Sequence, residues 1–215
     1  MSRVVVFGGH GKVALRAAPL LVGAGHEVGA IVRNPDHVGD VADAGATPIV
    51  ADIEYLDVAK IAALIEGYDV VVWSAGAGGG DSKRTYAVDR DAAIRSMDAA
   101  GRAGISRYVM VSYFGAGLDH GVDSGNSFHA YAQAKAEADD YLKSTSLDWT
   151  ILGPSALTLD QGTGLIDTKD AGATGGSVTR DDVAAAVVAA IASPGTIGRF
   201  IEFDNGSTPI AEALG

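Results

Sequence analysis

The sequence of 215 residues contains no cysteine. This absence excludes a disulfide framework, a metal site built from thiolates and a cysteine nucleophile. No apolar run is long enough to span a membrane, and the N-terminus lacks the basic and then apolar pattern of a signal peptide. We therefore expect a cytoplasmic protein with no membrane partner.

Basic residues are also scarce. Lys and Arg total 16 against 27 for Asp and Glu, so the formal net charge is −11. Because binding to a nucleic-acid backbone needs a basic face, we expect no nucleic-acid partner. The five histidines show no spacing typical of metal ligands, so we predict no metal site.

The chain does contain a regular alternation of apolar strand patterns with helical patterns. This alternation predicts an α/β fold, a single doubly wound parallel sheet (Rossmann fold) with helices on both faces and a small C-terminal extension. A chain of this length forms one sizeable core. We therefore predict one domain over residues 1–215, with a small substrate-side portion formed by about residues 155–180 and 200–215.

Several elements of this fold can be placed in advance. Residues 85–103 have the length and alanine content of a long helix. Thr179 is expected to cap the helix that follows it. Residues 115–128 and 155–177 are expected to be long irregular loops, which in a compact domain are usually functional or mobile.

A glycine turn follows the first strand directly. The apolar residues 4–7 lead into Gly8-Gly9-His10-Gly11-Lys12-Val13-Ala14 and then into an apolar helix pattern, the context required of a dinucleotide-binding site. Gly8 permits the tight turn, Gly11 lets the backbone approach a pyrophosphate, and Ala14 lets the helix pack closely on the strand. The free N–H groups and positive dipole end of that helix favour phosphate. We predict that Gly8, Gly9, His10, Gly11, Lys12 and Val13 contact the coenzyme.

The end of the second strand indicates which coenzyme is bound. The strand expected over residues 27–32 ends at Arg33, and no Asp or Glu stands there. A carboxylate at this place suits the ribose hydroxyls of NAD, whereas an arginine suits the additional phosphate of NADP. We therefore expect NADP, with NAD the less favoured coenzyme and Lys12 as a second basic group.

A second chemical signal lies in Tyr131-Ala132-Gln133-Ala134-Lys135. Tyr131 and Lys135 are four residues apart and share one helix face. A neighbouring ammonium stabilises a phenolate, so we expect a Tyr131 pKa below its ordinary value of about 10 and a role as general acid or base. Ser112 follows the fifth strand at the same sheet edge and is expected to hold a carbonyl oxygen.

These motifs together resemble those of atypical short-chain dehydrogenase/reductases, in the compact NAD(P)-binding group that includes NmrA-like and sugar-epimerase-like proteins. The likeness covers nearly the whole chain. It implies a catalytic Ser112, Tyr131 and Lys135. It also implies coenzyme contacts from Asp52, Ile53, Ser74, Ala75, Gly76, Lys135, Pro154 and Ser155.

The chain departs from that group in two places. Leu152-Gly153-Pro154-Ser155 resembles an Arg-Pro-Gly segment near the nicotinamide, but Gly153 stands in place of the arginine. The C-terminal part is shorter than in the longer epimerases, which makes a nucleotide-sugar substrate less favoured. Ser74-Ala75-Gly76, the start of the glycine-rich stretch of residues 74–80, resembles the segment beside the adenine ribose.

The sequence favours an NADP-dependent oxidoreductase that transfers hydride between nicotinamide and a small carbonyl or alcohol substrate, with Tyr131 as proton donor or acceptor. Three alternatives stay open: an NADP-binding sensor without turnover, an NADPH-dependent flavin or quinone reductase, and an epimerase of a small sugar. The sequence leaves the oligomeric state open between monomer and homodimer.

Overall fold

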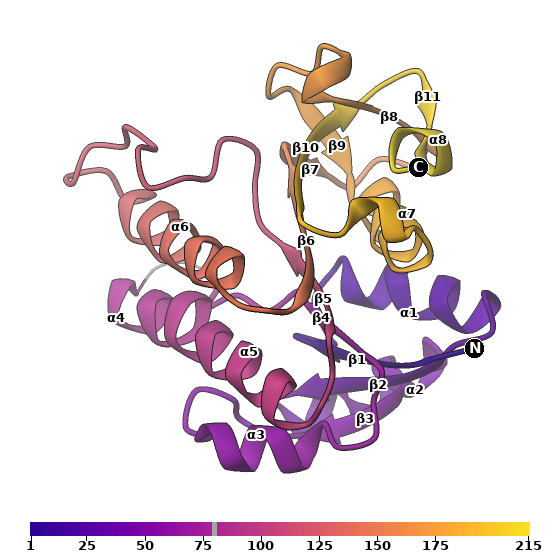
Figure 1. Ribbon diagram of the computed structural model, residues 1–215, viewed down its shortest axis with the longest axis vertical. Coiled ribbons are helices and arrows are strands. Elements are labelled where there is room, and N and C mark those ends of the chain that lie inside the picture. The colour runs from indigo at the N-terminus through magenta and orange to yellow at the C-terminus, as the bar shows by residue number, and fades with distance from the viewer. Residues whose placement is uncertain (79–80) are drawn as a thin grey trace.

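The computed structural model describes residues 1–78 and 81–215, so Gly79 and Gly80 of the glycine-rich stretch lie outside the described residues. Within the described part, nine strands form one sheet. The strands are β1 (Arg3–Phe7), β2 (Glu27–Val32), β3 (Thr47–Val50), β4 (Val70–Trp73), β5 (Arg107–Val111), β6 (Asp148–Pro154), β8 (Leu165–Thr168), β10 (Arg199–Asn205) and β11 (Thr208–Pro209). Their order across the sheet is β11-β8-β10-β6-β5-β4-β1-β2-β3 (Figure 1).

Most of this sheet is parallel. Every pairing from β10 through β6, β5, β4, β1 and β2 to β3 is parallel, whereas β8 pairs antiparallel with both β10 and β11. The apolar runs predict this burial, because β4 is buried at every residue and β1 at all but its first. The fold is therefore α/β with a large, mostly parallel sheet, as predicted, and its two antiparallel strands form one edge.

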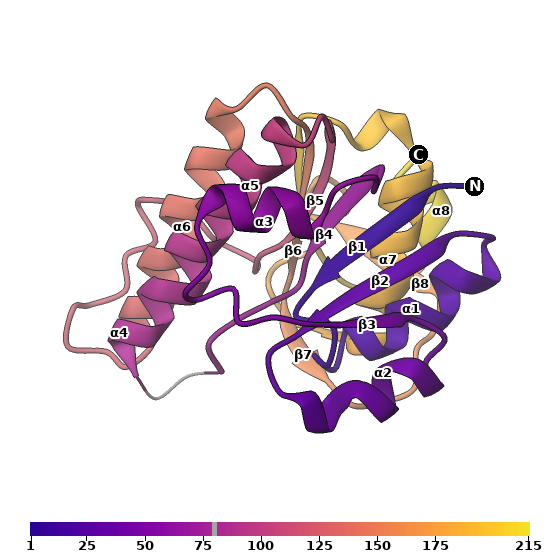
Figure 2. The same cartoon turned by 90° about the horizontal axis from the view of Figure 1, so that it is seen from below.

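Helices cover both faces of the sheet. They are α1 (Ala14–Gly23), α2 (Val38–Asp43), α3 (Val58–Leu64), α4 (Ser82–Thr85), α5 (Ala93–Arg102), α6 (His129–Ser144), α7 (Arg180–Ala192) and α8 (Ile210–Ala213). Figure 1 shows α3, α5 and α6 on one side and α1 and α7 on the other, and Figure 2 shows α2 beside α1. Each layer has its own buried apolar cluster, one around Leu21 and Val187 and the other around Trp73 and Met97.

The order of the strands fixes where a ligand can bind. β1 lies between β2 and β4, so the chain winds outward from β1 in one direction and then in the other. At such a switch point the loops after the two neighbouring strands diverge, and ligands bind outside the carboxyl ends of the strands. The glycine turn after β1 and the segment after β4 both lie there.

Two elements differ from the sequence prediction. The helix expected over residues 85–103 begins earlier, at Ser82, and its middle is a π-helical segment, Tyr86–Ala92. The loop expected over residues 155–177 is not irregular throughout, because it contains β7 (Ala156–Thr158) and β8 and leads into β9 (Ser177–Thr179), which pairs with β7. Short strands of this kind depend on pairing with distant residues, which leaves no local pattern.

Two other predictions are confirmed. Residues 115–128 contain neither helix nor strand. Thr179 caps α7, because its Oγ1 accepts a hydrogen bond of 3.0 Å from the Asp182 N–H. In the part of the chain that the structure describes, no helix is both long and apolar enough to cross a membrane.

Candidate functional site

The glycine turn after β1 leaves little space for a side chain at its glycines. Gly8 has a φ of +80°, and a Cβ added to it would lie 2.6 Å from the Cα of Ala75. A Cβ on Gly11 would lie 3.0 Å from the Gly8 carbonyl oxygen. At Gly9 a Cβ would meet the Ala30 side chain at 2.6 Å. The turn therefore packs against β2 through Gly9 and leaves Gly8 and Gly11 beside the switch point.

A hollow of about 240 Å³ opens beside this turn. It lies between the ends of β1, β2, β3 and β4. Of the predicted coenzyme residues, its lining includes Gly8, His10, Gly11, Arg33, Asp52, Ile53, Ser74, Ala75 and Gly76. Sequence reasoning missed Asn34, His37 and Arg84, which also line it. The residues predicted to hold the adenosine half of the coenzyme thus surround one hollow.

Basic and aromatic side chains lie together at the β2 end of this hollow. The rings of His10 and His37 are stacked with their centroids 3.5 Å apart. The Nε2 of His10 lies 2.7 Å from an oxygen of the exposed Asp40 carboxylate. Arg33 lines the same hollow and is exposed. Lys12, expected to assist Arg33, lines the neighbouring hollow instead.

That second hollow, of about 550 Å³, shares Gly11 and residues 74–76 with the first. Its lining includes Lys12 and Val13 from the turn and brings together Ser112, Tyr131 and Lys135. Pro154 and Ser155 are not in the lining of either hollow, and the Ser155 N–H donates to the Phe203 carbonyl. The shared residues join the predicted coenzyme hollow to the predicted catalytic residues.

Lys135 is held by the strand that precedes Ser112. Its side chain is only 1% exposed. The Nζ donates a hydrogen bond of 2.9 Å to the Val111 carbonyl and lies 3.2 Å from the Met110 sulfur. These contacts hold the Lys135 amine at the end of β5, and no hydrogen bond joins it to the Tyr131 hydroxyl in the described structure.

The expectation of a lowered Tyr131 pKa is therefore wrong for this arrangement. Burial raises the pKa of Tyr131, and the nearby carboxyls of Asp89 and Asp139 raise it further. The Tyr131 ring packs against Phe128 and Tyr113, with centroids 5.3 Å and 5.7 Å away. Tyr131 thus stays a phenol at neutral pH, which is the form able to donate a proton.

Two buried aspartates flank the Ser, Tyr and Lys residues, and sequence reasoning missed both. Asp89, from the π-helical segment, lines the second hollow and accepts a hydrogen bond of 2.9 Å from the Ala77 N–H. Asp139 stands four residues beyond Lys135 on α6 and is hydrogen-bonded to the Ser112 hydroxyl. Burial raises the pKa of each carboxyl. The four-residue spacing of Tyr131, Lys135 and Asp139 was the one available signal.

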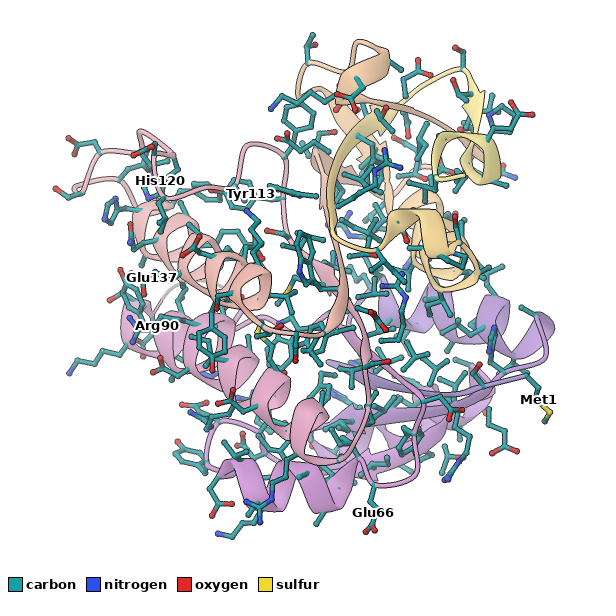
Figure 3. The ribbon with its side chains drawn as sticks, in the orientation of Figure 1. Met1, Glu66, Arg90, Tyr113, His120 and Glu137 are labelled. Atoms are coloured by element: carbon teal, nitrogen blue, oxygen red, sulfur yellow. The ribbon has the colours of Figure 1, made fainter. Side chains whose placement is uncertain are left out.

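An ion pair holds the two aspartate-bearing elements together. Arg90, in the π-helical segment, lies 3.0 Å from Glu137 of α6. Figure 3 shows these two side chains meeting between the helices, and it shows Tyr113 near the start of the 115–128 loop. The ion pair joins the π-helical segment that carries Asp89 to the helix that carries Tyr131. Because both partners are partly exposed, we assign it a positioning role rather than a large stabilising one.

The C-terminal part of the chain supplies one wall of the second hollow. Leu157 and Arg180 line it. The guanidinium of Arg180 donates to the carbonyls of Leu157 and Thr158 at 2.9 Å and 2.8 Å. These bonds join the start of α7 to β7 and place an apolar and a cationic side chain opposite the α6 residues.

Comparison with known proteins agrees with this geometry. A family model described as NAD(P)H-binding matches residues 8–194. An uncharacterized sugar epimerase of Bacillus subtilis, YhfK, is 34% identical over 216 residues, which cover 99% of this chain and 98% of the relative.

Two solved structures are also similar to this chain. A Bacillus halodurans protein named as a candidate NAD-dependent epimerase/dehydratase is 33% identical, with a TM-score of 0.91 over 100% of this chain and 99% of its own. ChuY, an anaerobilin reductase of Escherichia coli O157:H7, is 25% identical, with a TM-score of 0.78 over 96% of this chain and 98% of its own.

Proposed function

Because this chain belongs to the NAD(P)H-binding family, we propose that it is an NADP-dependent oxidoreductase acting on a small carbonyl or alcohol substrate. One observation carries the proposal: Ser112, Tyr131 and Lys135 line a hollow that continues from the one beside the glycine turn. The tight backbone at Gly8 and Gly11, where a Cβ would crowd the Ala75 backbone and the Gly8 carbonyl, is of the kind that binds a dinucleotide pyrophosphate and supports the proposal. When bound, the coenzyme supplies or accepts the hydride.

The protein's own residues supply the acid and the orientation. Tyr131 donates the proton to the substrate oxygen in the reducing direction, because burial keeps its hydroxyl protonated. Ser112 holds that oxygen in place. The buried Lys135, bonded to the Val111 carbonyl, fixes the spacing between α6 and the end of β5. The aromatic rings of Tyr113 and Phe128 limit the freedom of the Tyr131 ring.

Exchange of Tyr131 for Phe tests this assignment. Turnover should fall by roughly 10²–10⁴, the usual contribution of a positioned acid, while NADPH affinity hardly changes. The assay follows NADPH oxidation with a panel of carbonyls, quinones, flavins and, because of the anaerobilin reductase among the similar structures, anaerobilin.

Tyr141→Phe is the matched control. Tyr141 lies on the same helix, but its hydroxyl donates to Asp98 outside the hollow. Equal rates for the Tyr131→Phe and native proteins would contradict the assignment and favour a flavin or quinone reductase that needs no tyrosine.

The preference for NADP rests on Arg33, with His10 and His37 beside it. A charge-assisted hydrogen bond to the extra phosphate contributes about 1.5–3 kcal/mol. Arg33→Ala should therefore weaken NADPH binding about tenfold or more and leave NADH binding nearly unchanged, as measured by calorimetry. Equal losses for both coenzymes would show that Arg33 does not contact the phosphate that distinguishes them.

An epimerase of a small sugar is the second candidate. The names of the Bacillus subtilis relative and of the Bacillus halodurans structure favour it. An epimerase oxidises and reduces the same carbon, so the coenzyme shows no net change. NMR of small sugars incubated with protein and a trace of coenzyme would detect the inverted product, whereas the oxidoreductase consumes NADPH in proportion to product.

A further inference from the structure

The further inference concerns Ser112 and Asp139, which form a buried hydroxyl–carboxyl pair behind the catalytic hollow. Ser112 is 5% exposed and Asp139 is 2% exposed. The Ser112 hydroxyl is hydrogen-bonded to Oδ2 of Asp139. The other oxygen, Oδ1, is buried and has no hydrogen-bond partner among the described residues. Ser112 itself lines the hollow, so the pair connects the hollow to a buried acid.

This hydrogen bond can be made in two ways. When the Asp139 carboxyl is ionised, it only accepts, so the Ser112 hydroxyl must donate to it and can offer only a lone pair to the hollow. When the carboxyl is protonated, it can donate to the Ser112 oxygen, and the serine proton is then free to point into the hollow. One proton on Asp139 therefore reverses the hydrogen-bonding character of Ser112.

The surroundings of Asp139 act on its proton in opposite directions. The titratable side chains that act on it are Lys135, Lys143 and Tyr131 from α6, Tyr108 from β5 and Tyr113 just beyond β5. Burial raises the Asp139 pKa, and it outweighs Lys135, the hydrogen bond from Ser112 and Lys143, which favour the ionised form. Lys135 donates to the Val111 carbonyl rather than to Asp139, which leaves the carboxyl without a direct ion pair in the described structure.

We propose that Asp139 is a positioning residue whose proton decides whether Ser112 donates to, or accepts from, the oxygen of the substrate. A carbonyl oxygen needs a donor and a substrate hydroxyl needs an acceptor, so neutral Asp139 favours binding of the carbonyl form of the substrate and ionised Asp139 favours binding of the alcohol form. The transferred proton comes from Tyr131, and no proton leaves the Ser112–Asp139 pair during turnover. The catalytic consequence rests on the proposed function, whereas the coupled titration of the pair does not.

Infrared difference spectra of the whole protein, recorded without substrate while the pH rises, test that titration. The native protein should show a carboxylic-acid carbonyl band that disappears with rising pH. The same band should be absent in Asp139→Asn and shifted in frequency in Ser112→Ala, which removes its hydrogen-bond partner. Asp89→Asn, which removes the other buried carboxyl of the hollow, should keep it. A spectrum that Asp139→Asn leaves unchanged would overturn the proposal.

Binding of the two substrate forms tests the consequence, measured in the non-reacting complexes of the carbonyl with NADP and of the alcohol with NADPH. In Asp139→Asn the amide can donate to Ser112 at every pH, so the Kd of the carbonyl should stay within about threefold of native and lose its rise at high pH. The Kd of the alcohol should rise about tenfold, the value of one lost hydrogen bond. Asp139→Leu should weaken binding of both forms. Equal weakening of both forms in Asp139→Asn, with an unchanged pH dependence, would mean that Asp139 is only structural.

The infrared and substrate experiments distinguish failure of the proposed function from failure of this inference. If no substrate is turned over, the proposed function fails, and the infrared arm still decides whether Ser112 and Asp139 titrate as a pair. If turnover is found but the Asp139 band is missing, the inference fails and the oxidoreductase assignment survives.

Discussion

At the scale of single residues, the site is unusual in how many of its acids are buried. Asp89 is 1% exposed and Asp139 is 2% exposed, beside a Lys135 that is 1% exposed. A buried charge costs free energy unless it is paired, and neither aspartate has a direct ion pair among the described residues. Buried ionisable groups of this kind are common at functional sites; Asp89 lines the second hollow, and Asp139 is hydrogen-bonded to Ser112, which lines it too.

The raised pKa of Asp139 has a consequence for stability. The folded state keeps the proton at pH values where the unfolded chain, with an ordinary Asp pKa of about 3.9, has lost it. The free energy of unfolding therefore falls as pH rises from that value through the raised one. Asp139→Asn removes this slope, so the stability of the variant relative to the native protein should improve between about pH 3, below the ordinary Asp pKa, and about pH 8. If folding strengthens proton binding to the Asp139 carboxyl tenfold, the improvement should be about 1.4 kcal/mol, and each further tenfold should add the same amount. Urea unfolding of both proteins at the two pH values measures the difference, and a constant difference would contradict the raised pKa.

At the scale of elements, the turn between β1 and α1 is the segment that tolerates the fewest residue types. Gly8 combines a φ of +80° with a Cβ position 2.6 Å from the Ala75 backbone, whereas Gly25 has a φ of +87° and open space around it. Gly25→Ala should cost about 1–2 kcal/mol for the left-handed backbone alone. Gly8→Ala should cost more, because strain and collision add. Urea unfolding compares the two, and equal losses would show that the turn can move away from β4.

Elements with a strong local pattern could be predicted from the sequence. The buried strands around β1 and β4, the glycine turn and the Thr179 cap each carry their signal within a few residues. The short strands β7, β8 and β9 do not, because their pairing with distant partners forms them. The π-helical segment gave no signal either, since none of its residue types distinguishes a π-helix from an α-helix.

The residues of the site also divide into those that a local sequence pattern predicts and those that it does not. Motif spacing placed Ser112, Tyr131 and Lys135 in one hollow, because helix geometry and strand ends are local properties. Asp89 and Asp139 could not be predicted, because an aspartate in a helix gives the same local sequence pattern whether its side chain faces water or a core. The direction of the Tyr131 pKa was wrong for a related reason: spacing gives the face that Lys135 shares with Tyr131, and only packing shows that Lys135 bonds to Val111.

At the scale of the whole molecule, charge opposes the proposed ligand. The formal net charge of −11 repels an anionic dinucleotide. Screening at physiological salt limits exposed charges to about 8 Å, so the groups that line the hollow outweigh the distant carboxylates. Arg33, Lys12 and Arg180 line the two joined hollows. We therefore expect dinucleotide binding to depend on a few local cations placed by the fold.

Binding to those groups should stabilise the entire fold. A ligand that binds only the folded state adds about 2.7 kcal/mol at a concentration one hundred times its Kd. For a chain of this size each kcal/mol raises Tm by about 2–4 °C, so saturating NADPH should raise Tm by about 5–10 °C in scanning calorimetry. NADH at the same concentration should give a smaller rise, because it lacks the phosphate expected to pair with Arg33. In Gly11→Leu the side chain would enter the proposed pyrophosphate position, so the variant should fold yet show no rise. A native protein whose Tm does not respond to NADPH or NADH would contradict the oxidoreductase and sensor hypotheses together, since both require the dinucleotide to bind this hollow.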